Sequence, residues 1–270
     1  SFHQSNFVDK FMGMKSVKLS DGARVDIAGH GNIESNHVGY ARFVPKTNSR
    51  YLLSVGRLFY NCNNDYSCSD FVTGNVIPGQ VPSSVTRYGN VSMFDNISIV
   101  EVSNPGLYPV RLDGSVFNYV LPPQSTRHID MRALKVNGLT LFELKTNGKV
   151  IASVVNYELD NQLSWVVPFG GIYDTQVVEW NTYIDQIVYV DVFNTGIKQT
   201  VTLDVFDSEG ELIESGNYED SHYSAVLEKN GSKRFIIEVP KDRYGTVVVK
   251  GKQLVVTSSL RKANEYVIVK

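Results

Sequence analysis

The sequence predicts an all-β protein that contains two tandem, related β-sandwich domains. Short segments in which apolar and polar residues alternate recur about every ten residues, while the helical spacing of apolar residues is hard to find. Turn dipeptides bound these segments, and two parts of the chain repeat the same order of predicted strands. The alternation indicates half-buried strands, and the repeat indicates that one sandwich pattern occurs twice.

The predicted strands are separated by residues that favour tight turns. Asn147-Gly148 joins two of the strands directly, so we expect a hairpin there. Pro122-Pro123 and the segment 77–84, which contains two prolines, are expected to lie in connections or at sheet edges, because proline cannot donate a ladder hydrogen bond. The clearest predicted strands are residues 98–103, 140–145, 150–155, 186–193, 200–206 and 246–250.

The internal repeat aligns residues 98–157 with residues 188–266. Each copy opens with a strand that ends in Asn-x-Gly, at Asn104-Pro-Gly106 and at Asn194-Thr-Gly196. A second strand, a turn followed by an Arg-led segment, and a final hairpin come next in both copies. The corresponding segments are 110–112 and 201–206, 121–130 and 227–237, and 141–154 and 247–259.

The second copy is longer by a segment around residues 209–224, which is rich in Gly, Asn, Asp, Ser and Tyr. Such an insertion is typical of a loop or hairpin and leaves a core intact. The polar residues at 160–162 interrupt two apolar stretches. We therefore predict an N-terminal β-sandwich domain over residues 1–160, which includes a disulfide loop, and a C-terminal β-sandwich domain over residues 161–270.

This succession of strand, Asn-x-Gly, strand, proline or glycine turn, Arg-led strand and final hairpin resembles a β-sandwich repeat domain of bacterial exported proteins. It is also similar in strand succession to the sensory rhodopsin transducer fold. The resemblance covers residues 98–157 and 188–266. It implies modules with structural or binding roles and provides no catalytic residues, because the shared motifs are turns and strand edges.

The composition is typical of a globular protein, with 42% hydrophobic and 20% charged residues. A formal net charge of −2 provides no field that would attract nucleic acid, so nucleic-acid binding is disfavoured. No apolar run is long enough for a transmembrane helix, and we expect no transmembrane segment.

Cys62 and Cys68 are the two cysteines of the chain and lie in one short polar loop. Two thiols this close in such a loop favour a disulfide and an oxidising compartment, with two free surface thiols as the alternative. We therefore expect an extracellular or cell-surface location, with the periplasm as an alternative.

Cofactors are not predicted, although the same loop offers oxygen ligands for calcium as a weaker alternative. The segment from His30 to His37 also contains Glu34, but its spacing does not match a known metal motif and its glycine content argues against a helix. No metal site is predicted from it. The oxygen ligands of the loop are Asn61, Asn63, Asn64, Asp65 and Asp70.

Catalytic signatures are not found in the sequence. A Gly-x-Ser-x-Gly elbow and a phosphate-binding glycine loop are both missing, so a catalytic role is doubtful. A pair of carboxylates that meets only in space would leave no sequence signature, and a glycoside hydrolase remains a third hypothesis on that ground. Its candidate residues are Glu143, Glu158, Glu179 and Asp185.

Tyrosines with polar neighbours are the best candidates for a binding surface, because exposed aromatic rings stack on sugars or anchor protein contacts. Trp165 and Trp180 lie among apolar residues, which favours a core or interface position. The predicted binding residues are Tyr60, Asp65, Tyr66, Tyr218 and Tyr223, and Tyr88 is also expected to be exposed.

The leading functional hypothesis is a non-catalytic structural or adhesive module of an exported cell-surface protein. A carbohydrate-binding module is the alternative, and aromatic rings that lie together on a sheet face or a loop rim would favour it. The expected partners are a surface glycan, a protein or further copies of the chain, because exposed edge strands can pair with one another.

Overall fold

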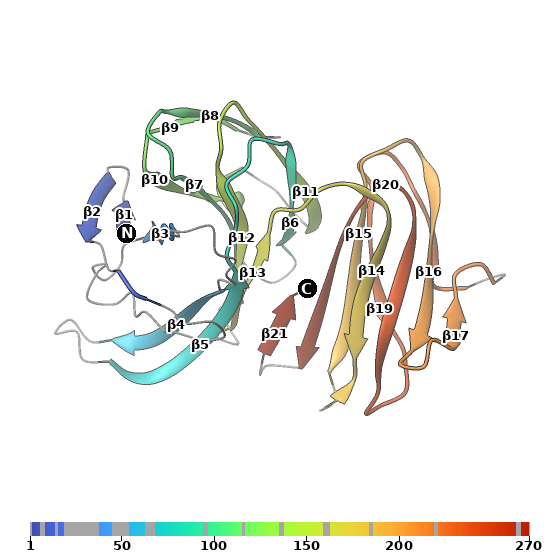
Figure 1. Cartoon of the computed structure of the whole chain (residues 1–270). Coiled ribbons are helices and arrows are strands. Elements are labelled where there is room, and N and C mark those ends of the chain that lie inside the picture. The colour runs from blue at the N-terminus through green and yellow to red at the C-terminus, as the bar shows by residue number, and fades with distance from the viewer. Residues whose placement is uncertain are drawn as a thin grey trace.

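The computed structural model confirms the all-β fold class, since the described residues lie almost entirely in strands (Figure 1). Among these residues, no helix has the length and apolar character needed to cross a membrane. The structure describes residues 2–5, 9–13, 16–18, 38–44, 54–62, 68–93, 97–114, 117–134, 138–158, 163–183, 186–218, 221–262 and 266–269.

The N-terminal part of the chain forms two small antiparallel sheets. The first has the order β2-β1-β3, and the second is a hairpin of β4 and β5. Contacts of β1 and β3 with β10, and of β5 with β13, place these strands against the sheet described next. The bounds are β1 (Phe2–Ser5), β2 (Asp9–Gly13), β3 (Val38–Ala41), β4 (Ser54–Cys62) and β5 (Cys68–Pro78).

Two four-stranded antiparallel sheets follow and form the first sandwich. Their strand orders are β10-β7-β12-β13 and β6-β11-β8-β9. Alternating apolar residues of the two sheets, such as Val100, Val102 and Phe142, enclose one buried core. The bounds are β6 (Arg87–Met93), β7 (Ile97–Asn104), β8 (Val110–Gly114), β9 (Asn118–Leu121), β10 (Ser125–Asp130), the 3-10 helix η1 (Met131–Leu134), β11 (Gly138–Thr146), β12 (Ile151–Glu158) and β13 (Leu163–Pro168).

The second sandwich is built around the long strand β20, which takes part in two layers. Its first half pairs with β14 and β16, and its second half pairs with β15 and β21. The change of layer coincides with Gln253, whose φ is +54°. A separate core contains Trp180, Val190 and Leu203. The bounds are β14 (Tyr173–Asn181), β15 (Ile187–Asn194), β16 (Gln199–Asp207), β17 (Leu212–Ser215), β18 (Ser224–Leu227), β19 (Ser232–Ile237), β20 (Tyr244–Lys262) and β21 (Tyr266–Val269).

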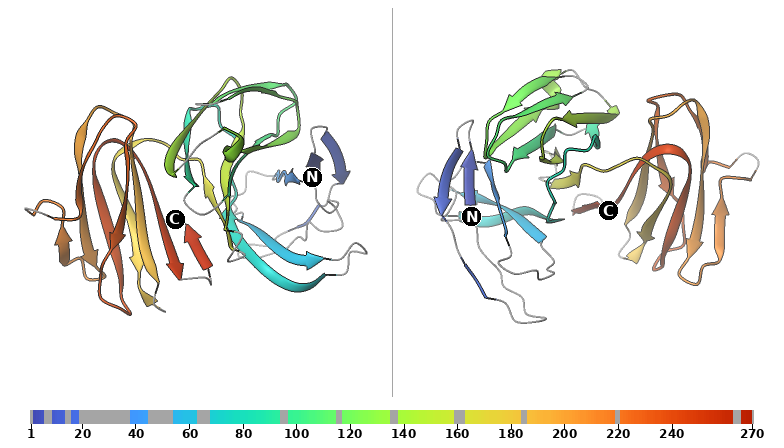
Figure 2. Two further views of the ribbon diagram at one scale, coloured as in Figure 1. Left: turned by 180° about the vertical axis from the view of Figure 1, so that it is seen from behind. Right: turned by 45° about the horizontal axis from the view of Figure 1, so that its top comes forward.

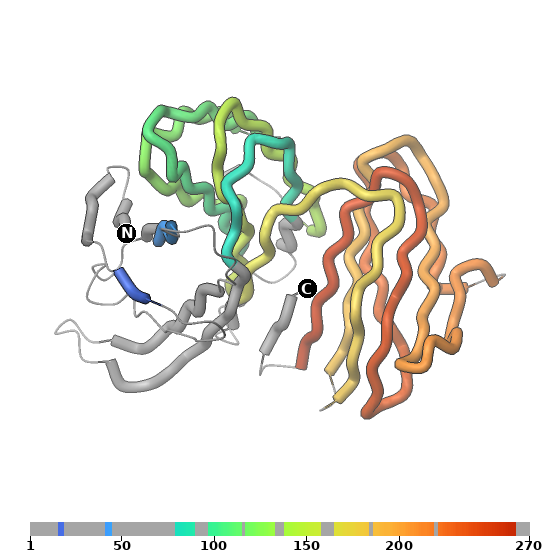
Figure 3. The backbone as a smooth tube through the Cα atoms, in the orientation of Figure 1, coloured from blue at the N-terminus to red at the C-terminus, as the bar shows by residue number. Residues whose placement is uncertain are grey.

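The two sandwiches repeat the same order of strand pairing. The first runs from green to yellow and the second from yellow to red in Figures 2 and 3. In the first, β7 pairs with β10 and β12, β8 pairs with β9 and β11, and the edge strands β6 and β13 pair with β11 and β12. In the second, β15, β16, β18 and β19 take the places of β7, β8, β9 and β10, and the two halves of β20 take those of β11 and β12. The extra strand β17 lies within the insertion predicted at 209–224.

A buried asparagine ends the first strand of each copy and makes the same four hydrogen bonds. Asn104 Nδ2 donates to the carbonyls of Tyr108, Leu121 and Pro122, and its Oδ1 accepts from the Gly106 N–H. In the second copy, Asn194 Nδ2 donates to the carbonyls of Ile197, Leu227 and Glu228, and its Oδ1 accepts from the Gly196 N–H. Both asparagines are fully buried.

The predicted division of the chain at residues 160 and 161 stays a prediction. One pairing bears on where such a boundary would fall. Strand β13 lies beyond residue 160 but pairs with β12 of the first sandwich, with Val166 opposite Val155. The predicted strands and the Asn147-Gly148 hairpin agree with the structure, in which β11 and β12 flank that turn.

Substituting the buried asparagines should destabilise the fold strongly. In Asn194→Ala, three carbonyls, the Gly196 N–H and the side-chain amide of Gln199 lose their partner, so we expect the free energy of unfolding to fall by about 2–4 kcal/mol. Asn104→Ala should behave alike. Urea unfolding measures the change, with Asn147→Ala as the control, because exposed Asn147 accepts one bond from the Arg111 N–H and should lose about 1 kcal/mol or less. If Asn194→Ala and Asn147→Ala lost equal amounts of stability, the proposed role of the buried asparagine would be contradicted.

Two buried serines should respond in opposite ways to replacement by alanine. Ser258 Oγ is buried without a hydrogen-bond partner among the described residues, and Val154 takes its place in the first copy. Ser258→Ala should therefore leave stability unchanged or raise it by up to about 1 kcal/mol. Ser98→Ala removes the bond from Ser98 Oγ to Asn156 Oδ1 (2.5 Å) and should cost about 1–2 kcal/mol. Thermal melts of both variants test this contrast.

Candidate functional site

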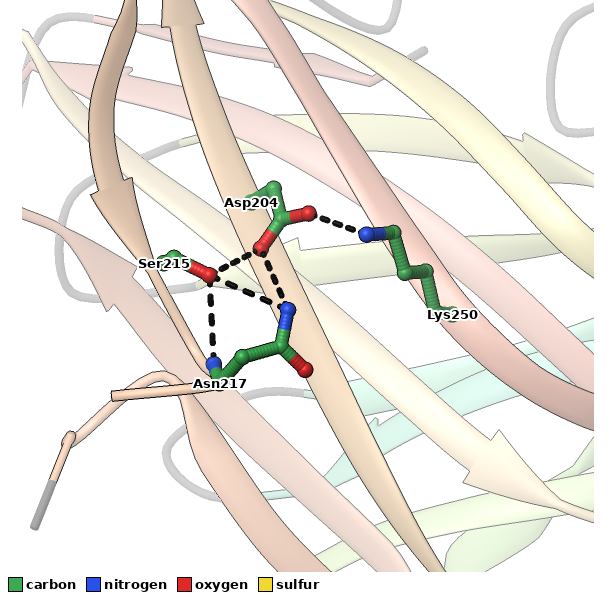
Figure 4. A network of polar contacts seen from close by, with 4 residues as sticks. All are labelled: Asp204, Ser215, Asn217 and Lys250. Carbon is green, nitrogen blue, oxygen red and sulfur yellow. Dashed lines mark hydrogen bonds and ion pairs between the residues drawn. The ribbon is translucent and has the colours of Figure 1, made fainter. Parts of the chain in front are cut away.

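A carboxylate network lies across three neighbouring strands of the second sandwich (Figure 4). Asp204 on β16 is buried, and its Oδ1 accepts hydrogen bonds from Ser215 Oγ at 2.5 Å and from Asn217 Nδ2 at 3.4 Å. Its other oxygen, Oδ2, is bound by the ammonium group of Lys250 on β20. Both oxygens of the carboxylate are therefore engaged within the protein.

The charge state of Asp204 follows from these contacts. Burial alone would raise the pKa of Asp204, but the hydrogen bonds from Lys250 and Ser215 and the charge of Lys250 outweigh burial and hold this pKa below its usual value. The carboxylate stays ionised near neutral pH. An ionised carboxylate with its oxygens occupied stabilises the sheet and is a poor proton donor.

A carboxylate three residues before the buried asparagine lies opposite a basic side chain in each copy. In the second copy, Arg234 Nε and Nη2 donate to the two oxygens of Asp191 at 2.7 and 2.8 Å. Burial would lower the pKa of Arg234, but the hydrogen bonds and charge of Asp191 raise it. In the first copy, His128 Nε2 lies 3.6 Å from Glu101 Oε2. The pairs occupy equivalent register positions on the first strand of each sandwich.

Arg234 also lies over a tyrosine, with its guanidinium carbon 5.1 Å from the ring centre of Tyr189. Arg127, which leads the corresponding segment of the first copy, makes a closer contact of this kind. Its guanidinium carbon lies 3.7 Å from the ring centre of Tyr119, a cation–π contact between β10 and β9. Tyr119 also lines a shallow surface hollow together with Arg111, Asn118 and Val120. Because Arg127 covers one face of the ring, that face is closed to a ligand.

Two tyrosines lie side by side at one end of the second sandwich. Tyr183 follows β14 and Tyr244 begins β20, and their ring centres are 6.3 Å apart with an angle of 31° between the planes. The side chains are 47% and 54% exposed. We call this pair the rim tyrosines. Neither tyrosine is among the binding residues predicted from the sequence, although each has a polar residue beside it.

Among the predicted binding residues, the structure describes the side chains of Tyr218 and Tyr223. Tyr218 is exposed in the turn after β17, as expected. Tyr223 was predicted to be exposed, and this is wrong: it is fully buried in the second core, and its hydroxyl accepts from the Glu238 N–H at 2.8 Å. Tyr60 lies on β4, but its side chain, Asp65 and Tyr66 lie outside the described residues.

Tyr223 was misjudged because its polar neighbours Ser221 and His222 suggested a loop. The residue lies just before β18, where its side chain enters the second core. Tyr88 is half-buried rather than exposed and donates to Glu143 Oε1 at 3.3 Å. Burial, together with the charge of Glu143 and this hydrogen bond, raises the pKa of Tyr88. Trp180 is buried and Trp165 packs against the first core, as predicted.

The cysteine pair is placed by its backbone. Cys62 and Cys68 are directly opposite partners in the β4–β5 ladder. Opposite residues of antiparallel strands have Cα atoms about 4.5–5.5 Å apart, which lies within the range of a disulfide. The disulfide itself stays a prediction. The side chains proposed as calcium ligands, and the segment 30–37, lie outside the described residues.

Of the carboxylates considered for glycoside hydrolysis, the structure describes the side chains of Glu143 and Glu179, and these two do not form a pair. Glu143 is on β11 and forms an ion pair with Lys145 at 3.2 Å, whereas Glu179 is on β14 of a different sheet. The side chain of Glu158 and the whole of Asp185 lie outside the described residues.

No protein-family model matches the sequence, and no curated protein matches it closely enough to be counted. The site must therefore be interpreted from its own residues.

The acid sensitivity of the fold should depend on Asp204. The pKa of this group is lowered on folding, so its stabilising contribution is complete above the unfolded value of about 4 and is lost as pH falls through the lower folded value. Asp204→Asn should reduce stability at pH 7 and flatten the decline of stability below pH 4. Urea unfolding between about pH 2 and pH 7 measures both effects. Asp113→Asn, at a largely exposed ion pair, is the control; if it flattens the decline equally, the assignment to Asp204 fails.

Proposed function

We propose that this chain is a non-catalytic structural or adhesive module of an exported cell-surface protein. The observation that carries the proposal is the duplication of one sandwich, with the same pairing order and the same buried asparagine in each copy. Repetition of a unit with its own core produces a longer scaffold. We include in the proposal that the two sandwiches are tandem domains of the kind found in bacterial exported proteins.

The buried carboxylates of the second sandwich support a structural role. Asp204 and Asp191 each use both carboxylate oxygens to bind side chains of neighbouring strands. A general acid or base must exchange a proton with a substrate and so needs an accessible oxygen. These buried carboxylates instead connect strands of the sheet, where their loss would weaken the scaffold.

The proposed location outside the cell rests on the cysteine pair. A disulfide between Cys62 and Cys68 would close the end of the β4–β5 hairpin, and such bonds persist in oxidising compartments.

The contact between sandwiches supports transmission of load along the chain: Ser232 Oγ on β19 donates to the Leu139 carbonyl on β11 at 3.0 Å, and β13 contacts β21.

The proposed function is tested by attaching the full chain to beads and measuring their retention under flow. The test surfaces are bacterial and animal cells, insoluble polysaccharides, and a layer of the same chain. Beads that carry an adhesive or self-assembling module should be retained on at least one surface, in excess of beads that carry an inert protein of similar size.

The matched enzymatic measurement is a panel of chromogenic glycosides. We expect no turnover by the chain. Turnover that Glu143→Gln or Glu179→Gln abolishes would contradict the proposal and support the hydrolase hypothesis. Absence of retention on every surface would refute the adhesive form of the proposal.

A further inference from the structure

The rim tyrosines form a small aromatic surface that is partly open to solvent. Their ring centres are 6.3 Å apart with 31° between the planes, which is within the range of an interacting aromatic pair, so the two rings pack against one another as a unit. About half of each side chain is exposed to solvent. Neither hydroxyl has a hydrogen-bond partner among the residues that the structure describes. Both an apolar face and a polar edge are thus presented to a ligand.

The backbone under the two rings is fixed by one buried threonine. Thr182 Oγ1 donates to the Pro240 carbonyl at 2.6 Å and accepts from the Arg243 N–H at 3.2 Å, while the Thr182 N–H donates to the Arg243 carbonyl at 2.8 Å. Asn181 pairs with Tyr244 in the β14–β20 ladder. These bonds join the segments that carry the two tyrosines. The pair is therefore preorganised, which lowers the entropy lost on binding.

Close packing below the pair adds to this rigidity. Trp180 is buried, and its Nε1 donates to the Phe206 carbonyl at 2.9 Å. Gly245 lies against Trp180 and Phe206 so closely that a Cβ atom at this position would be 2.0 Å from the Phe206 oxygen. Any larger residue would displace the start of β20 and with it Tyr244.

The surroundings of the pair are polar. Exposed Asp242 and Arg243 precede Tyr244, and Asn181 lies opposite it in the ladder. Amide, carboxylate and guanidinium groups bind neighbouring hydroxyls through directed hydrogen bonds. A small aromatic surface with such a border differs from the contiguous apolar patches of several hundred Å² that mark protein interfaces.

We propose that Tyr183 and Tyr244 form a binding site for a neutral saccharide, in which the C–H face of a sugar ring packs on the tyrosines and its hydroxyls bind the polar border. This inference rests on the proposed adhesive function and names its ligand class. The geometry provides the two features that a sugar needs, a flat apolar surface and nearby hydrogen-bonding groups.

The test is binding of the full chain to a glycan array and to insoluble polysaccharides, followed by titration of the best glycan. We expect Tyr183→Ala and Tyr244→Ala each to weaken binding by about tenfold or more. Tyr183→Phe and Tyr244→Phe retain the ring and should lose less. Tyr173→Ala is the matched control, because Tyr173 is 59% exposed at the opposite end of β14. Thermal melts establish that each variant is folded.

Each outcome decides the inference. Loss in both alanine variants with retention in the control supports it. Failure of the wild-type chain to bind any glycan overturns it, while bead retention on cells or on the chain itself would leave the adhesive function standing. Glycan binding that survives both alanine substitutions refutes this site but supports adhesion. The last outcome is a chain that binds no glycan but associates with itself, and whose self-association either alanine variant abolishes. That result assigns the tyrosine pair to a protein contact and overturns the proposed saccharide site.

Discussion

The structure depends on a buried amide that must be fully hydrogen bonded. Asn104 and Asn194 each lie at the end of a strand in one layer of a sandwich and bind carbonyls at the end of a strand in the other layer. An unpaired amide in this position would cost several kcal/mol, so the turn after each asparagine and the connection before the Arg-led segment are held in one geometry. The glycine two residues on provides the N–H that completes the set. The amide therefore determines how the two layers meet.

Local patterns in the sequence were sufficient to predict the strands, the hairpin at Asn147-Gly148 and the repeat. They identified Asn-x-Gly as a turn, but its role between layers could not be predicted because the carbonyl partners lie 17 and 33 residues away. Tyr223 shows a second limit. Side chains of a strand alternate between faces, so a single position decides whether a tyrosine is buried, and polar neighbours carry no information about that position. The rim tyrosines depend on a strand pairing that no local pattern reveals.

The two copies share their framework and differ at their surfaces. A carboxylate faces a basic side chain at the same register in both, as Glu101 with His128 and as Asp191 with Arg234. Among the described residues, the β17 insertion and, on the adjacent strands, the Asp204 network belong to the second copy. In the first copy Arg127 of β10 lies over Tyr119 of β9, whereas in the second Arg234 of β19 lies over Tyr189 of β15. Thus the core and the inter-layer bonds specify the fold, and residues outside them were free to acquire separate roles.

The division between a shared framework and surfaces that differ indicates where a ligand would be recognised. A ligand that recognised the shared framework would encounter buried groups, since the asparagines and paired carboxylates already use their hydrogen-bonding capacity within the protein. In the first copy, Leu139 takes the place of Tyr244, and its carbonyl binds Ser232 of the second sandwich. The same strand end in the second copy carries an exposed tyrosine instead. The same strand end therefore makes a contact within the chain in one copy and is open to a ligand in the other. This difference favours the rim tyrosines, over any feature that the two copies share, as the place where a ligand binds.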